Sequence, residues 1–160
     1  MLEAKPVGST LSENCKLSRK QSPKTKAEKA DMMKVPYASA VGSLMYSMVY
    51  TRPDIGYAVG VVSRFMSNPS KEHWNAVKWI LWYLKGTSNM CLRFGSCKPQ
   101  LDGFTDSDML ADVHTSRSTS GYVMTFAGGA VSWQSRLQKT VALSTTEVEY
   151  MAAMDEGIHR

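Results

Sequence analysis

The chain has 160 residues, of which 43% are hydrophobic and 21% charged, and its formal net charge is +5. This composition suffices for a packed core in one ordinary domain or two small units, and it excludes a protein that is disordered throughout. The first ten residues lack the apolar core of a signal peptide, and no apolar run reaches the length of about 18 residues that spans a membrane. Three cysteines without metal-ligand spacing favour a reducing, intracellular compartment, the cytoplasm or the nucleus.

The net charge is distributed unevenly. Residues 1–34 carry eight basic and four acidic side chains, residues 35–100 carry seven and two, and residues 101–160 carry four and eight. The two basic segments suit the phosphate backbone of a nucleic acid, because Lys and Arg gain sequence-independent affinity by releasing counterions. For residues 1–34, a contribution to solubility alone is an equally good explanation. This first segment is polar and rich in Lys and Ser, and we expect a flexible, basic lead-in.

Residues 35–86 predict three helices joined by short loops, which make neighbouring helices antiparallel. Their ends are marked by prolines and the residues that precede them, by a serine N-cap and by a glycine C-cap. The first helix has Pro36 in its first turn and reaches about Tyr50, the second follows a break at residues 51–54 and stops at Asn68-Pro69, and the third runs from an N-cap at Ser70 to Gly86.

Basic and aromatic residues share one face of the third predicted helix. At 100° per residue, the positions that fall together are Lys71, Trp74, Lys78, Trp82 and Lys85. Such a stripe can hold a nucleic-acid backbone and stack on exposed bases, so we predict that Lys71, Lys78, Trp82 and Lys85 bind nucleic acid. The alternative is that Trp74 and Trp82 are core residues with lysine stems beside them.

Residues 101–137 predict three successive antiparallel strands. Apolar and β-branched residues up to Thr105 indicate the first strand, which places the carboxylate of Asp106 inside a sheet. Residues 121–126 and 130–133 indicate two more strands, and the two glycines between them are a hairpin signal.

A helix is predicted to follow the third strand. Ser144 with Glu147 three residues later has capping-box spacing, and apolar residues recur behind it at helical intervals. Glu147 is thereby explained by capping, which leaves Glu149 as the carboxylate available for other chemistry. For Asp106 considered alone, a surface turn residue would be the more common explanation.

Several stretches of sequence within residues 101–153 resemble a known protein family. FTDSD, RSTSGY, VSWQSRLQKTVALSTTEVEY and MAA, all within residues 101–153, are similar to the start of the RNase H domain in the Pol polyproteins of copia-type LTR retrotransposons. Residues 35–87 resemble the segment that follows the reverse-transcriptase palm in the same polyproteins. The resemblance implies an α+β chain with a lead-in at 1–34, a helical connection segment at 35–97 and a truncated RNase H-like domain at 98–160, with three antiparallel strands and then a helix.

The same resemblance implies a site. The family's first two catalytic carboxylates fall on Asp106 and Glu149, which would be both catalytic residues and ligands of Mg²⁺ in the hydrolysis of RNA within RNA:DNA hybrids. The implied partners are an RNA:DNA hybrid or another nucleic acid and the remainder of the Pol polyprotein, with no membrane. The family's later carboxylates would lie beyond Arg160, and Met109 and Ala111 replace the Trp and Gly common in the family.

Two functions therefore stay open. One is Mg²⁺-dependent cleavage of RNA in a hybrid by an incomplete site, and the other is nucleic-acid binding by a catalytically inactive remnant. Polymerisation is excluded for this chain, because it holds no Tyr-x-Asp-Asp motif and no two adjacent aspartates.

Overall fold

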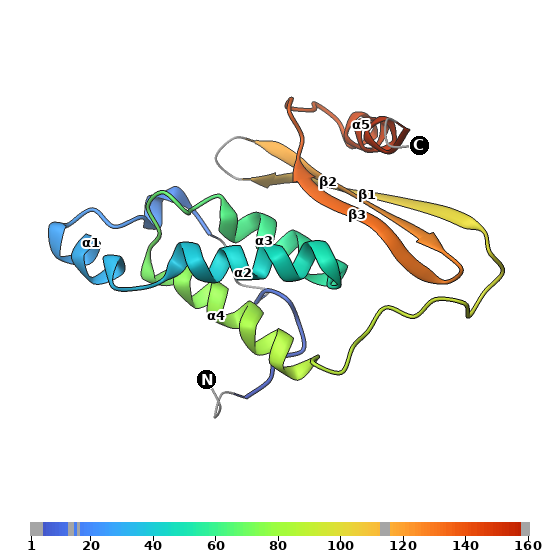
Figure 1. The fold of residues 1–160 in the computed structure, drawn as a ribbon. Helices are drawn as coiled ribbons and strands as arrows, with labels where there is room; N and C mark the ends of the chain where they lie inside the picture. The colour runs from blue at the N-terminus through green and yellow to red at the C-terminus, as the bar shows by residue number, and fades with distance from the viewer. Residues whose placement is uncertain (1–4, 13–14, 16, 113–115, 158–160) are drawn as a thin grey trace. The chain divides into compact units, whose positions relative to one another are not determined.

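The computed structural model describes residues 5–12, 15, 17–112 and 116–157 of the chain (Figure 1). It divides into two compact units, Met1–Met90 and Cys91–Arg160. The first is helical, and the second holds a three-stranded antiparallel sheet and one helix, so the predicted mixed α+β class is confirmed. In the described part of the chain, no helix combines the length and the apolar character needed to cross a membrane.

The helical unit is built around three helices that pack on one another. Its elements are η1 (Arg19–Gln21), α1 (Lys26–Met33), α2 (Tyr37–Tyr50), η2 (Pro53–Ile55), α3 (Gly56–Ser63) and α4 (Lys71–Gly86). Fully buried aliphatic side chains of α2, α3 and α4 form the core between them. The three predicted helices are thus present, but α3 ends at Ser63, and residues 64–67 form a turn where helix was expected.

The described parts of the N-terminal segment contact the helical unit. Thr25 and Glu28 form a capping box that begins α1. Val7 and Leu17 are partly buried against the helical core, and the indole Nε1 of Trp79 donates to the carbonyl of Ser9 at 2.9 Å. The described residues before 34 therefore belong to the helical unit, because scattered apolar side chains that look isolated in the sequence meet its surface.

A polar network ties the turn before α3 to the end of α4. The guanidinium of Arg52 donates to both carboxylate oxygens of Asp54, at 2.9 and 2.7 Å. The hydroxyl of Tyr83 donates to Asp54 at 2.8 Å, and Arg52 also donates to the hydroxyl of Thr87 at 2.6 Å. These bonds fix the C-terminal end of α4 relative to the turn before α3.

The second unit contains strands β1 (Leu101–Asp112), β2 (Arg117–Phe126) and β3 (Gly129–Leu137), in the order β1-β2-β3. The strands are longer than the sequence predicted. The hairpin turn between β2 and β3 is formed by Ala127 and Gly128, with φ of 51° and 85°, rather than by the two glycines. Positive φ at both central positions matches a type I′ turn, whose twist suits the flanking strands.

Helix α5 (Thr145–Gly157) packs against β1 and β2. Its predicted start is confirmed, because Ser144 Oγ accepts from the backbone N–H of Glu147 at 3.2 Å and the Glu147 carboxylate accepts from the N–H of Leu143 at 2.8 Å. Val148 is buried, and Gln138 Nε2 donates to its carbonyl at 3.0 Å. These contacts attach α5 to the end of β3.

Candidate nucleic-acid interface and carboxylate pair

The candidate interface lies on α4, whose start is firmly capped. Ser70 Oγ accepts from the backbone N–H of His73 at 3.4 Å, and the Ser70 N–H donates to Nδ1 of His73 at 2.9 Å. His73 is fully buried and its ring stacks on Phe65 with centroids 4.0 Å apart. Burial lowers the pKa of His73, so the ring stays neutral and Nδ1 keeps its lone pair for the cap.

The predicted nucleic-acid contacts lie on the side of α4 opposite the core. The core side of the helix carries the buried residues His73, Ala76, Val77, Ile80 and Tyr83. At 100° per residue, Lys71, Lys78, Trp82 and Lys85 centre about half a turn away from them. Lys71 and Lys85 are exposed, and Lys78 and Trp82 are half-buried. We call these four residues the α4 stripe.

Trp74 and Trp82, the two tryptophans on the predicted basic and aromatic face, differ in their packing. Trp74 packs against the helical core and its ring centroid lies 6.4 Å from that of Tyr37, so it is a structural residue. Trp82 is not among the described residues that make up that core. Its ring lies 6.2 Å from Trp79, a residue that the sequence analysis did not select. The spacing of Trp79 and Trp82, three residues apart on one helix, was the signal for this ring pair.

The two predicted carboxylates are both exposed. Asp106 lies in β1 opposite Gly121 of β2, and its Oδ1 accepts from the backbone N–H of Ser107 at 2.8 Å. Glu149 lies in the second turn of α5, directly after the buried Val148. Each is thus held on a regular element, as the sequence predicted.

A small cavity shows which face of the sheet α5 covers. Ala152 of α5 lines this cavity with side chains from two strands: Ser120, Tyr122, Gln134 and Arg136. Alternate residues of a strand share a face, and Ser107 is paired with Ser120, so Ser107 lies on the face that α5 covers. By the same alternation, Asp106 lies on the opposite face. That Asp106 and Glu149 share divalent ions stays a prediction.

The donor atoms suit Mg²⁺, but the set is incomplete. Mg²⁺ prefers oxygen ligands, and two ions at one scissile phosphate need several carboxylates between them. Among the side chains that the structure describes, no group of three or more His, Cys, Asp or Glu residues could hold a metal ion. The described side chains therefore do not make up a complete two-metal site.

Comparison with curated proteins finds transposon polyproteins. The chain is 62% identical over 157 residues to the retrovirus-related Pol polyprotein from transposon TNT 1-94 of Nicotiana tabacum, which covers 98% of the chain and 12% of the polyprotein. It is 39% identical to the retrovirus-related Pol polyprotein from transposon RE1 of Arabidopsis thaliana, over 94% of the chain and 10% of that protein. The chain thus spans about a tenth of the length of these relatives.

A third relative is of a different kind. The secreted RxLR effector protein 161 of Plasmopara viticola is 53% identical over 124 residues, which are 76% of this chain and 86% of that protein. The same block therefore makes up most of a small protein as well as a minor part of large ones. No family model matches the chain, and no solved structure does.

Fold and comparisons together assign the chain to a class. It is a two-unit α+β protein in which a helical unit precedes an antiparallel sheet and a capped helix. The near-complete coverage by transposon Pol sequences then gives the family: the chain belongs to the copia-type retrotransposon Pol polyproteins.

Proposed function

We propose that this chain binds nucleic acid through the α4 stripe, as the part of a retrotransposon Pol polyprotein that holds the template or its product. The position of Lys71, Lys78, Trp82 and Lys85 on the outward side of a capped, core-anchored helix carries this proposal. The remainder of the polyprotein is the proposed protein partner. Lysine ammonium groups contribute sequence-independent affinity for phosphates, and a half-buried indole offers a face on which a base can stack.

A control variant with three matched lysine substitutions on or beside α1 makes the test specific for α4. Replacing Lys71, Lys78 and Lys85 with Gln should weaken binding of a labelled 12-nucleotide strand by at least about tenfold. Each lost phosphate contact lowers the number of counterions that are released on binding, and this release favours the complex. Replacing Lys24, Lys26 and Lys29, which are exposed on or beside α1, removes the same charge and should leave most of the affinity. Equal losses in the two triple variants would show that only the net charge matters and would contradict the interface on α4.

Hydrolysis is the second candidate function. The family resemblance supports Asp106 and Glu149 as two carboxylates of a Mg²⁺-dependent site that cleaves RNA in RNA:DNA hybrids. Strand alternation and the small number of ligands favour binding without cleavage for this chain alone. We therefore propose an incomplete site, and an intracellular location, in cytoplasm or nucleus, for the polyprotein that contains it.

A cleavage assay separates the two functions. The chain should bind a labelled RNA:DNA hybrid in the presence of Mg²⁺ and leave the RNA strand intact, with no difference between the unaltered chain and the Asp106→Asn variant. Cleavage that depends on both Mg²⁺ and Asp106 would mean that the two carboxylates meet in solution, and it would establish the hydrolytic function.

A further inference from the structure

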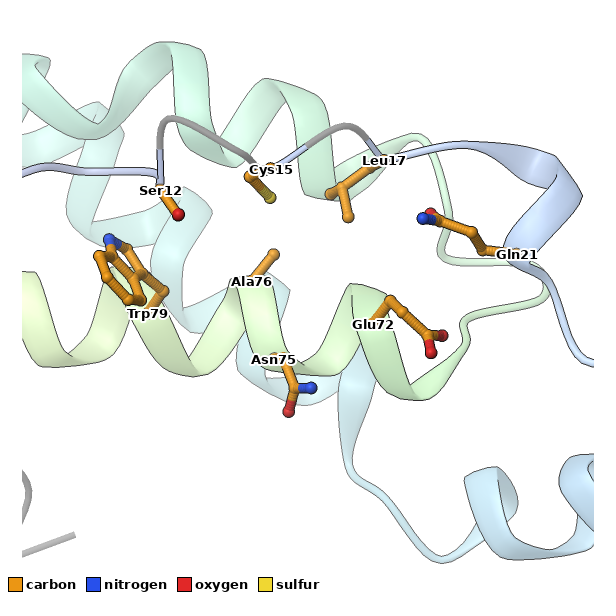
Figure 2. Close-up of a pocket in the computed structure, with 8 residues that line it drawn as sticks. All are labelled: Ser12, Cys15, Leu17, Gln21, Glu72, Asn75, Ala76 and Trp79. Carbon is orange, nitrogen blue, oxygen red and sulfur yellow. The ribbon is translucent and has the colours of Figure 1, made fainter.

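A cavity of about 320 Å³ lies between the N-terminal segment and α4 (Figure 2). Figure 2 shows Cys15 and Ala76 facing each other across its middle, Trp79 at one end, and Gln21 and Glu72 at the other. The volume is at the lower end of the range for small-molecule sites in proteins, about 300–1,000 Å³. It is enough for a flat heterocycle.

The lining selects an uncharged occupant. Of the described residues that line the cavity, none is Lys or Arg, and Glu72 brings a carboxylate. Burial raises the pKa of the Cys15 thiol, so this group stays neutral. The carboxylate of Glu72 would repel a phosphate inside the cavity. A heterocycle with donors and acceptors on its edge can instead use the carboxylate of Glu72 and the amide of Gln21, with apolar walls along its faces.

The cavity and the α4 stripe are adjacent on one helix. Trp79 lines the cavity, and its ring centroid lies 6.2 Å from that of Trp82 in the stripe. Glu72 and Trp79 each directly follow a stripe lysine, Lys71 and Lys78, along α4. A strand whose phosphates contact those two lysines therefore runs along the same helix as the cavity.

We infer that the cavity receives one unpaired nucleobase of a single-stranded nucleic acid whose phosphates lie on the α4 stripe. This inference rests on the proposed function and narrows it, because a base inside a duplex cannot enter the cavity without being flipped out. Affinity then depends on the bases as well as on the charge of the strand, and single strands are preferred to duplexes.

The first test compares strands of equal charge. The unaltered chain should bind a 12-nucleotide DNA strand of mixed sequence about tenfold more tightly than a 12-residue abasic strand, since stacking of a single base can supply that factor. Ala76→Leu fills the middle of the cavity and should remove most of this preference, leaving only the part that stacking on Trp82 contributes, with binding of the abasic strand unchanged. An Ala76→Leu variant that keeps the full preference overturns the inference.

The remaining outcomes are also decisive. If the unaltered chain binds both strands equally, the cavity takes no base, although the α4 stripe still functions as an interface. If it binds neither strand, the proposed function itself fails. The two failures are thus distinguishable in one titration.

A second measurement needs no substitution. Cys15 lines the cavity, whereas Cys91 and Cys97 are exposed in the other unit and serve as internal references. At saturation, the base-bearing strand should slow alkylation of Cys15 by iodoacetamide several-fold relative to the two reference thiols, and the abasic strand should not. Equal rates with the two strands would contradict occupancy of the cavity by a base, whether or not the Ala76→Leu variant folds.

Discussion

At the scale of single residues, His73 controls the start of the helix that carries the interface. Its Nδ1 accepts the Ser70 N–H only when that nitrogen is unprotonated, and burial of the ring lowers its pKa below the ordinary value. A hydrogen bond with the backbone of Ser18 and the neighbouring carboxylate of Glu72 oppose this effect only in part. A neutral buried ring is therefore a condition for the cap of α4.

The stability of the chain should consequently depend on pH. Because the pKa of His73 is lower in the folded than in the unfolded state, its contribution is fully present above the unfolded value of about 6.5 and is lost as the pH falls through the folded value. The thermal unfolding midpoint should decrease between pH 7.5 and 5.5. A His73→Gln variant should be less stable at pH 7.5 and show a flatter profile. The same slope in both proteins would assign the pH dependence to other groups.

The hydroxyl of Tyr83 makes a second residue-scale prediction. It donates to Asp54 at 2.8 Å in a largely buried position, so Tyr83→Phe should cost about 1 kcal/mol of unfolding free energy. Tyr50→Phe, at a ring that is 61% exposed, is the matched control and should be close to neutral. Combining Tyr83→Phe with Asp54→Asn should give less than the sum of the single effects in chemical denaturation. Strict additivity would mean that the two groups do not interact.

At the scale of elements, capping decides where helices begin. Ser70→Ala removes the side-chain acceptor at the N-cap of α4 and should cost about 1 kcal/mol, or roughly 2–4 °C in unfolding midpoint. Ser67→Ala changes an exposed serine in the preceding turn and should have little effect. Calorimetry on both variants tests the assignment, and indistinguishable midpoints would contradict it.

The elements also show what the sequence could and could not predict. Pro36, Ser70 and Glu147 are local signals, and the helices begin within one residue of the positions that they indicate. The lengths of the strands were underestimated, since they depend on pairing between chain segments. The turn between β2 and β3 was predicted one residue too late in the chain, because Gly128 can occupy either central position of the turn.

At the scale of the whole molecule, composition and literal strings were the informative signals. They predicted a mixed α+β chain of a retrotransposon Pol family, and both conclusions are confirmed. The contacts of the described N-terminal residues with the helical unit could not be predicted, because they join distant positions, such as Trp79 and Ser9, 70 positions apart. Nor does the sequence show which face of β1 carries Asp106, since a shift of one residue in register reverses it.

The most direct test of the proposed nucleic-acid interface is a salt titration of binding to a 12-nucleotide single strand. Each phosphate neutralised contributes about 0.7 to the slope of log affinity against log salt concentration, so replacing Lys71, Lys78 and Lys85 with Gln should reduce that slope by about 2. The control triple variant at Lys24, Lys26 and Lys29 should keep the slope of the unaltered chain. An unchanged slope after the α4 substitutions would contradict the interface on α4.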